Sequence, residues 1–421
     1  MATISTGPIE NTAVSGVRPT QQVTVKIDNR DSLNVSSILI QGYNLTVTRT
    51  LYVSELLTVA PDEVLTRNYF ADLDAYEFVF TTGGTAAEQT EVSVWGKNAA
   101  GQLVTAHRLV FAELVGDEDR AVAGSVNRIY VANFNSNSVT VINGATGGVI
   151  DTIPVGVNPA GVAVNPLTNR IYVANLNSNN VSVIDGATHM VMATVPAGSG
   201  AGAAAVNTAT NAIYVANFND NTITVIDGLT NTVVTTIIPA GGSPFPTGIG
   251  VNSLTNTIYV AEFNSDIVTV IDGATNTVIT QIPVQVNPFR VGVNPLTNRI
   301  YVSNFTSNTV SVIDGATNTV ITNVPVGTTP AELGVNVSTN AIYVPNRDTD
   351  NVSVIGGLTN TVITTIPVGN NPNGAGANPL TNRIYITNQD DNTVSVIDGV
   401  TQAVISVIPV GARPFSVGVN P

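Results

Sequence analysis

A small group of residues in short polar segments carries most of the chemistry that this sequence could perform. Arg290 and Arg413 bear guanidinium groups that can hold a carboxylate or a phosphate at two points. The carboxyl group of Glu332 could act as a general base towards such a ligand. We predict that these groups share one ligand face, a central funnel, with aromatic and acidic neighbours. The predicted set is Phe245, Glu262, Phe289, Arg290, Glu332, Arg413 and Phe415.

The composition removes several other classes of chemistry. The chain has no cysteine, which excludes disulfides, thiolate metal ligands and a thiol nucleophile. Its two histidines, His107 and His189, cannot form a three-histidine metal site. Asp348 and Asp350 in the segment 346–351 are a weak calcium hypothesis, since clustered side-chain oxygens suit a hard cation, but their spacing differs from an EF-hand loop. We predict no catalytic residue and no cofactor.

The charge balance restricts the partners of the chain. Its 421 residues carry 15 Lys and Arg against 29 Asp and Glu, a net charge of -14, and the lysines are Lys26 and Lys97 alone. Nucleic-acid binding needs clustered cations, so this balance argues against it. No apolar run approaches 18 residues, which predicts no membrane insertion. The first twenty residues lack the basic and apolar regions of a conventional secretory signal.

A repeat positions the predicted ligand face. The phrase that begins NRIYVANFNSNSVTVINGATG occurs, with modest changes, in seven copies at intervals of 42 residues, with one interval of 45. Each copy holds four short runs rich in β-branched residues, separated by Gly, Pro, Asn or Asp, which is the pattern of four strands and tight turns. Four strands per 42 residues is the period of a propeller blade. The repeat tyrosines are Tyr130, Tyr172, Tyr214, Tyr259, Tyr301, Tyr343 and Tyr385.

The strand order within a blade follows from side-chain size. The run after each repeat proline reads GVAV, GIGV or GAGA in different copies, and such small residues fit the crowded innermost strand. We label this strand a, and IYVAN, VSVIDG and VITTIPVG are then b, c and the outer strand d. The chain ends on an eighth copy of strand a over 415–419, which we expect to pair with 129–132 and close the ring.

The residues IYVAN, VSVIDGATN, TVIxTIPVG and NPxGVAVNP resemble the YVTN family of propeller repeats over about seventy per cent of the chain. The resemblance implies a seven-bladed propeller and says little about function, because this fold hosts unrelated activities. The wider group includes lactonase-like enzymes, a streptogramin lyase and bacterial surface proteins. Those enzymes use His or Glu clusters with a metal, which this sequence does not match residue by residue.

The residues before the repeat form separate parts. Residues 21–117 read as seven strands with turn signals every 8–14 residues, which predicts an antiparallel β-sandwich or jelly roll. Two stretches, DNRDSLNVSSILIQ and EVSVWGKNAAGQLVTAHRLV, are similar to β-modules of surface proteins from spore-forming bacteria. Residues 1–20 form a polar arm that either adds a strand to a neighbouring subunit, or docks on its own domain, or is disordered. Its apolar positions are Ile4, Ile9, Val14 and Val17.

The strand order predicts that b–c and d–a loops share one face of the propeller, which spans 118–421. Asparagine stands three, five and seven residues after most repeat tyrosines, as in Asn133, Asn135 and Asn137. A ring of amides could bind a glycan or a protein, but recurrence in every blade favours turn chemistry. The same reasoning makes the aspartates of the VIDG segments structural turn residues.

These observations lead to three functional hypotheses. The first is a non-enzymatic bacterial surface protein that self-associates through the arm and β-module and displays the propeller for interaction or adhesion. We expect it outside the cell or on a cell or spore surface, as a homo-oligomer or filament. The second is a lactonase- or lyase-like enzyme that uses the d–a loop funnel. The third is a glycan-binding module.

Overall fold

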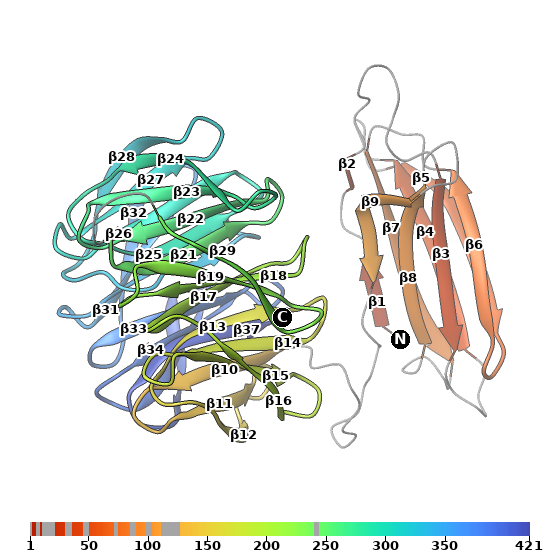
Figure 1. Ribbon diagram of the computed structural model, residues 1–421. Helices are drawn as coiled ribbons and strands as arrows, with labels where there is room; N and C mark the ends of the chain where they lie inside the picture. Colours follow the sequence, from red (N-terminus) through yellow and green to blue (C-terminus); the bar gives the residue numbers. More distant parts are fainter. Residues whose placement is uncertain are drawn as a thin grey trace. The chain divides into compact units, whose positions relative to one another are not determined.

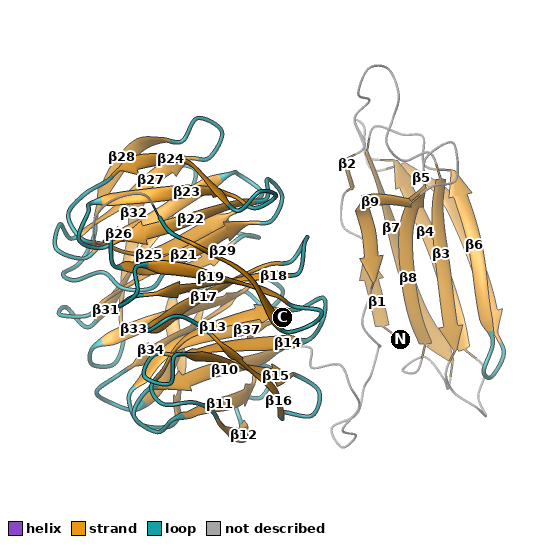
Figure 2. Ribbon diagram, in the orientation of Figure 1, coloured by secondary structure: helices purple, strands orange, loops and turns teal. Residues whose placement is uncertain are grey.

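The computed structural model describes residues 2–5, 9–10, 22–29, 36–44, 50–70, 75–84, 90–97, 103–110, 127–239 and 244–421. Contacts divide the chain into two compact units, Met1–Gly124 and Ser125–Pro421. Every regular element in the described part of the chain is a β-strand (Figures 1 and 2). The protein is therefore all-β, as the sequence predicts.

The second unit is a seven-bladed propeller, and each blade is a four-stranded antiparallel sheet. In each blade the strands follow the order a, b, c and d from the axis to the rim. Blade 1 is β37 (Pro414–Asn420), β10 (Arg128–Asn133), β11 (Ser138–Asn143) and β12 (Val149–Pro154); blade 2 is β13 (Pro159–Asn165), β14 (Arg170–Asn175), β15 (Asn180–Asp185) and β16 (Val191–Pro196); blade 3 is β17 (Ala201–Asn207), β18 (Ala212–Asn217), β19 (Thr222–Asp227) and β20 (Thr232–Ile237).

The remaining four blades continue the same order. Blade 4 is β21 (Pro246–Asn252), β22 (Thr257–Glu262), β23 (Ile267–Asp272) and β24 (Thr277–Pro283); blade 5 is β25 (Pro288–Asn294), β26 (Arg299–Asn304), β27 (Thr309–Asp314) and β28 (Thr319–Pro325); blade 6 is β29 (Gly334–Asn336), β30 (Ala341–Asn346), β31 (Asn351–Gly356) and β32 (Thr361–Pro367); blade 7 is β33 (Pro372–Asn378), β34 (Arg383–Asn388), β35 (Thr393–Asp398) and β36 (Ala403–Pro409).

The last strand of the chain closes the ring. Strand β37 pairs antiparallel with β10, with Val419 opposite Ile129 and Val417 opposite Val131. Blade 1 thus takes its inner strand from the C-terminus and its other strands from the start of the repeat (Figure 1). This pairing confirms the predicted closure and removes an unpaired strand edge.

The hydrophobic core lies between neighbouring blades. Tyr130 of blade 1 is fully buried and packs in one cluster with Val162 and Ile171 of blade 2. Every repeat tyrosine is at most 1% exposed. Strand d alternates exposed and partly or fully buried residues because it forms the rim of the blade, whereas strand b is buried on both faces. The repeat tyrosine therefore joins one blade to the next.

Crowding at the axis explains the small residues of strand a. A Cβ atom on Gly250 would lie 2.7 Å from Cγ1 of Val291 in the next blade. One on Gly161 would lie 2.8 Å from the Cα atom of Ala203. Contacts this short require atoms of the next blade to move, so a larger side chain at either glycine would disturb the packing.

The first unit contains two antiparallel sheets. One has the order β6 (Val64–Phe70), β3 (Gln22–Asn29), β8 (Thr90–Lys97) and β9 (Leu103–Val110); the other has the order β1 (Ala2–Ser5), β7 (Ala75–Gly84), β4 (Ser36–Asn44) and β5 (Thr50–Val59), and β2 (Ile9–Glu10) also pairs with β7. Strands occur in all seven of the predicted segments. Alternate residues of β3, such as Val23, Val25 and Ile27, are buried.

The arm contributes strands to this unit. Ile4 lies opposite Phe80 of β7, and Ile9 lies opposite Tyr76 of the same strand. The other two apolar positions of the predicted arm, Val14 and Val17, lie outside the described residues. Within one chain, β1 therefore occupies an edge of the sheet.

Candidate ligand site at the centre of the loop face

The b–c and d–a loops lie on the same face of the propeller, which we call the loop face. The backbone N–H of Phe134 in a b–c loop donates to the carbonyl of Arg413 in a d–a loop at 2.9 Å. On the opposite face, the turn face, the N–H of Gly186 in a c–d turn donates to the carbonyl of Asn169 in an a–b turn, also at 2.9 Å. This arrangement is the one that the strand order predicts.

The recurring asparagines of the loop face have structural partners. The third residue after the tyrosine is buried, and its amide donates to hydroxyls of strand c, as Asn133 does to Thr140 at 2.8 Å. The seventh residue has a positive φ, and its side-chain oxygen accepts from the N–H of a d–a loop, as Asn137 does from Asn158 at 2.9 Å. Both positions therefore have a structural role: the buried asparagine bonds the neighbouring strand, and the later one joins two loops.

The aspartates of the VIDG segments close the turns on the other face. Oδ1 of Asp314 accepts from the N–H groups of Ala316 at 2.8 Å and Thr317 at 3.3 Å. The N–H of Ala316 is the main cause that lowers the pKa of this carboxyl. These residues are therefore structural, as predicted.

Two charged residues interrupt the ring of small residues around the axis. Strand a has an equivalent position that approaches the next blade, two residues after the repeat proline in six blades and two residues after Ala201 in blade 3. Blades 5 and 6 place Arg290 and Glu332 there. The other blades have Gly161, Ala203, Gly248, Gly374 and Ser416. In blade 6 the regular pairing of strand a also starts late, at Gly334. We call Arg290, Glu332 and their polar neighbours the axial site.

Glu332 is held in place by neighbouring inner strands. Its N–H donates to the carbonyl of Asn373 at 3.0 Å, and Ser416 donates to its Oε1 at 3.1 Å. Its Oε2 is buried without a hydrogen-bond partner. Burial raises the pKa of the carboxyl to about 7, against the lowering effects of Arg290 and of the hydrogen bonds. The group therefore titrates near neutral pH.

The guanidinium of Arg290 has both aromatic rings and charged side chains as neighbours. Its Nη1 donates to the carbonyl of Thr247, and its Cζ lies 4.4 Å from the ring centroid of Phe289 and 5.8 Å from that of Phe415. Burial lowers the pKa of the guanidinium to about 10; Glu332 opposes this change and Arg347 adds to it. Arg290 remains charged at neutral pH.

Arg347 stands outside the set predicted from the sequence but belongs to the same site. Its Nη2 donates to Oε1 of Gln389 at 3.2 Å, while its Nε and the Nε2 of Gln389 are buried without partners. Burial is the main cause that lowers the pKa of Arg347, and the charge of Arg413 is the next. Arg413 is exposed, with its Cζ 5.3 Å from the ring centroid of Phe134. Arg347 thus adds positive charge near Arg290, and Arg413 adds positive charge near Arg347.

Aromatic rings surround these charged groups. The rings of Phe289 and Phe305 lie 5.5 Å apart, Phe263 contacts both, and Phe415 lies 5.5 Å from Phe134. A signal for several of them exists in the sequence, at the position four residues after each repeat tyrosine. That position is Phe134, Leu176, Phe218, Phe263, Phe305, Arg347 and Gln389 in blades 1 to 7. The change from apolar to polar at blades 6 and 7 coincides with the axial site.

Two residues of the predicted ligand face lie apart from the axial site. Glu262 is 0% exposed, so its inclusion in the ligand face is corrected. It takes the place of the buried asparagine of blade 4, where Thr269 donates to its Oε1. Phe245 packs edge-on against Phe218, with ring centroids 4.9 Å apart. The structure brings together Phe289, Arg290, Glu332, Arg413 and Phe415.

The proposed calcium ligands have other roles. Oδ1 of Asp350 accepts from the N–H of Asn371 at 2.8 Å, the bond that asparagine forms in other blades. The N–H of Asp348 donates to Oγ1 of Thr329 at 3.2 Å. Among the described residues, no group of three or more His, Asp or Glu side chains could hold a metal ion. The geometry therefore gives no support to a calcium site in this segment.

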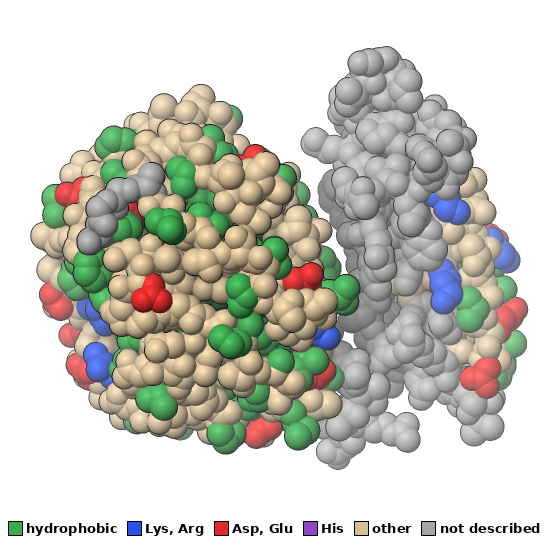
Figure 3. All heavy atoms as spheres, in the orientation of Figure 1, with side chains coloured by type: hydrophobic (Ala, Val, Ile, Leu, Met, Phe, Trp, Pro, Cys, Tyr) green, Lys and Arg blue, Asp and Glu red, His purple; other side chains and the backbone are tan. Residues whose placement is uncertain are grey.

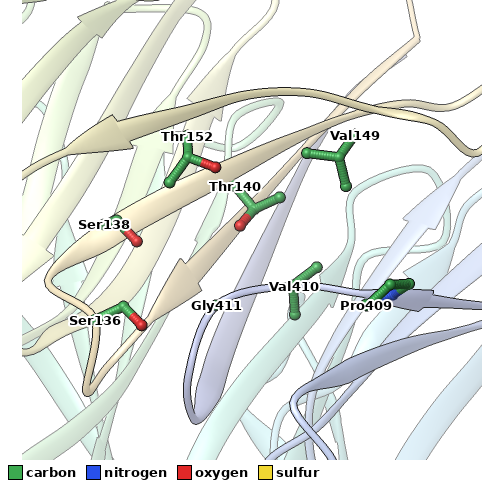
Figure 4. Close-up of a pocket in the computed structure, with 8 residues that line it drawn as sticks. All are labelled: Ser136, Ser138, Thr140, Val149, Thr152, Pro409, Val410 and Gly411. Atoms are coloured by element: carbon green, nitrogen blue, oxygen red, sulfur yellow. The ribbon is translucent and has the colours of Figure 1, made fainter.

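Grooves between neighbouring blades are a separate feature. One groove of about 470 Å³ lies between β11 and β12 of blade 1 and the loop after β36 (Figure 4). Its lining includes Ser138, Thr140, Thr152 and Val410. A second groove, of about 330 Å³, has the equivalent lining in blade 7, with Thr393, Ser395 and Val407 among its residues. Because the lining repeats, these grooves are a consequence of blade packing.

Comparison with known proteins supports the fold. No protein-family model and no curated protein sequence matches the chain. A functionally unknown protein from Desulfotomaculum acetoxidans is similar in structure, with a TM-score of 0.62, 14% identity, and coverage of 70% of this chain and 98% of the other. A protein from Bacteroides uniformis that is provisionally assigned as a 6-phosphogluconolactonase gives a TM-score of 0.60, 15% identity, and coverage of 70% and 99%.

Another similar structure is the hydrazine synthase of Kuenenia stuttgartiensis, with a TM-score of 0.58, 19% identity, and coverage of 68% of this chain and 99% of the other. At these identities the likeness concerns the fold alone. The described residues include no helix that is long and apolar enough to cross a membrane.

Proposed function

We propose that this protein is a non-enzymatic binding protein whose propeller is an interaction platform, with the axial site as its ligand contact. The observation that supports this proposal is the loss of repeat symmetry at the axis, where Arg290 and Glu332 replace small residues. A closed ring needs only small residues at this position, and five of the seven blades have them. Charged groups that are costly to desolvate are retained there for a ligand.

The sparse charge on the rest of the propeller supports its proposed role as an interaction platform. Its surface in the view of Figure 3 is mostly uncharged, with a few acidic and basic side chains scattered over it. The propeller residues include no lysine. Where charges are sparse, the group of charges at the axial site can direct polar ligands to it.

We propose further that the chain self-associates through its arm and β-module. Strand β1 pairs with β7 through backbone groups, with Ala2 opposite Thr82 and Ser5 opposite Val79. Backbone pairing depends little on side chains, so the same edge of β7 can accept the arm of a neighbouring subunit. Exchange of an identical strand between copies produces a homo-oligomer or, where the exchange does not close, a filament.

The resemblance of the sequence supports finer assignments within this proposal. The propeller is of the YVTN type, and the two sheets of the first unit form a β-sandwich or jelly roll. The protein is a bacterial surface protein, located outside the cell or on a cell or spore surface, and it functions in interaction or adhesion. The propeller has no lysine and few arginines, so it offers few sites to proteases that cut at basic residues. This composition suits an exposed setting.

A second candidate function, a lactonase- or lyase-like enzyme, is favoured by Glu332. A carboxyl group with a pKa of about 7 can act as a general acid or base at neutral pH. Arg290 could stabilise the negative charge that develops on a carbonyl oxygen. The similar fold of proteins provisionally assigned as 6-phosphogluconolactonases adds a fold-level analogy.

A glycan array probed with the full chain and with Arg347→Gln tests the binding function. We expect glycan binding by the full chain that weakens in Arg347→Gln and persists in Arg299→Gln, a matched change on the turn face. Binding that Arg347→Gln leaves intact, or no binding to any glycan, would contradict the proposal. Lactone hydrolysis that Glu332→Gln abolishes would establish the second candidate instead.

Negative-stain microscopy of the full chain and of a chain without residues 1–20 tests self-association. We expect oligomers or filaments that disappear on truncation. Single particles of monomer size in both samples would contradict the role of the arm.

A further inference from the structure

The arginines of the propeller fall into two groups with different roles. Seven of them belong to the described residues, and four begin the b strands β10, β14, β26 and β34. Arg170 donates to the carbonyl of Gly228 at 2.8 Å, and Arg299 forms an ion pair with Asp314 at 2.9 Å. These contacts stabilise turns. The other three arginines are those of the axial site, Arg290, Arg347 and Arg413.

The buried charges of the axial site are those of Arg290, Arg347 and Glu332, so two cations face one acid there. The charge of Arg347 lowers the pKa of Arg290, and the charge of Arg413 acts in the same way on Arg347. Glu332 is the acid that faces Arg290, and Asp348 and Asp390 act on Arg347 from the edge. An anionic ligand would relieve the repulsion among these arginines, although the chain as a whole has a net charge of -14.

Unpartnered polar atoms at the axial site include donors and acceptors. Nε of Arg347 and Nε2 of Gln389 are donors, and Oε2 of Glu332 and Oδ1 of Asn373 are acceptors. Most other buried unpartnered atoms recur from blade to blade, for example Oδ1 of Asn175 and its equivalents. Buried polar atoms find partners in native proteins, so a non-recurring set at one place points to a partner from outside the chain.

The rings of Phe289, Phe305 and Phe415 add an apolar boundary to this polar set. All three are partly exposed, and Arg290 lies over Phe289 and Phe415. A site with a few polar groups on an aromatic surface is typical of a small-molecule pocket. The combination requires a ligand with a negative charge, hydroxyl groups and an apolar face.

We infer that the axial site binds a carboxylated sugar, such as a uronic acid, with its carboxylate on Arg347 and its hydroxyls on Glu332, Asn373 and Gln389. The inference rests on the proposed binding function and specifies its ligand class. Arginine matches a carboxylate in geometry, and the C–H face of a sugar ring packs on phenylalanine. A simple anion would leave the acceptors of Glu332 and Asn373 unpartnered, and a neutral sugar would leave the arginine charges unbalanced.

Isothermal titration calorimetry of the full chain with D-glucuronate, D-glucose and acetate tests this inference. We expect D-glucuronate to bind at least tenfold more tightly than either control. Arg347→Gln should weaken D-glucuronate binding by about 10- to 100-fold, because a hydrogen bond to a charged group is lost. The exposed Arg413→Gln provides a second variant, with a smaller loss, if Arg347→Gln fails to fold. Arg299→Gln should bind as the unaltered protein does.

The possible outcomes separate the inference from the proposed function. Equal binding of D-glucose and D-glucuronate, or D-glucuronate binding that neither axial-site variant weakens, would overturn the inference. If the glycan array gives binding only to neutral glycans that Arg347→Gln weakens, the inference fails and the platform function stands. Titration with a tetragalacturonate and with D-galacturonate distinguishes two sources of the ligand. If the tetragalacturonate binds more tightly than D-galacturonate, the ligand is part of a polysaccharide; if the two bind equally, it is a free sugar acid. Both outcomes agree with the inference.

Discussion

Glu262 gives the most quantitative prediction because it is a buried carboxyl in a repeat that elsewhere uses asparagine. In blade 3 the amide of Asn217 donates to Thr224 and Thr222 at 2.8 and 3.0 Å. In blade 4 the direction reverses, since Thr269 donates to Oε1 of Glu262. The residue equivalent to Thr222 is Ile267, so Oε2 of Glu262 has no partner.

The magnitude follows from the pKa of this carboxyl. Burial raises the pKa of Glu262 from 4.5 to about 7, while the bond from Thr269 opposes the change. The folded state therefore binds the proton more tightly than the unfolded state, and stability falls as pH rises from about 4.5 to 7. This difference between the pKa of Glu262 in the unfolded and in the folded state corresponds to roughly 3 kcal/mol of unfolding free energy. The protein has this stabilisation below pH 4.5 and has lost it by about pH 8.

Replacement of Glu262 by Gln or Asn should remove this pH-dependent loss. Relative to the unaltered protein, we expect Glu262→Gln to gain roughly 3 kcal/mol between pH 4.5 and pH 8, since the amide does not ionise. Denaturant unfolding followed by near-ultraviolet circular dichroism of the buried tyrosines measures the difference. Glu262→Asn is the matched control, because it restores the residue of the other six blades and should show the same trend.

Glu332 has a similarly raised pKa, so the stability of either Glu262 variant should still depend on pH in part. Parallel stability curves for the unaltered protein and Glu262→Gln across this pH range would refute the reasoning. Such a result would mean that Glu262 ionises as easily in the folded protein as in the unfolded chain.

Three further changes test the architecture. Asn175→Ala should lower the unfolding free energy by about 2 to 3 kcal/mol in denaturant titrations, because the buried hydroxyl of Ser182 loses its amide partner; a change below 0.5 kcal/mol would contradict this role. Deletion of residues 414–421 should leave one edge of β10 unpaired and produce aggregated or unfolded propeller in size-exclusion chromatography. A stable monomer would show that the closing strand is dispensable. Asp350→Asn should leave the melting temperature unchanged, with or without added calcium, because the bond to Asn371 needs only a side-chain oxygen; stabilisation by calcium that this change abolishes would restore the calcium hypothesis.

The repeat made the architecture of the propeller predictable from sequence. Small residues such as Gly250 locate the inner strand because the axis excludes a side chain, and the copy at 415–419 implies closure on 129–132. A structural role for the asparagines was predictable for the same reason, since each blade repeats the same loops, but the bonds of the buried asparagine to strand c were not.

The axial site was predictable only in part. Arg290 and Glu332 stand out because they interrupt a series of small residues, and Phe289 and Phe415 are their neighbours in strand a. Arg347 was missed because it comes from a b–c loop in which variation looks ordinary until the seven copies are aligned by position. Glu262 was misplaced because a charged residue at a strand end reads as exposed, whereas this position is buried in every blade.

The most direct test of the central claim is a crystal structure of the protein with the tightest-binding glycan from the array. We predict ligand density at the axial site, with a carboxylate on Arg347 and a hydroxyl within hydrogen-bond distance of Glu332. Density in the groove lined by Ser138 and Val410, or on the turn face, would contradict the claim that the function of the propeller lies at its axis.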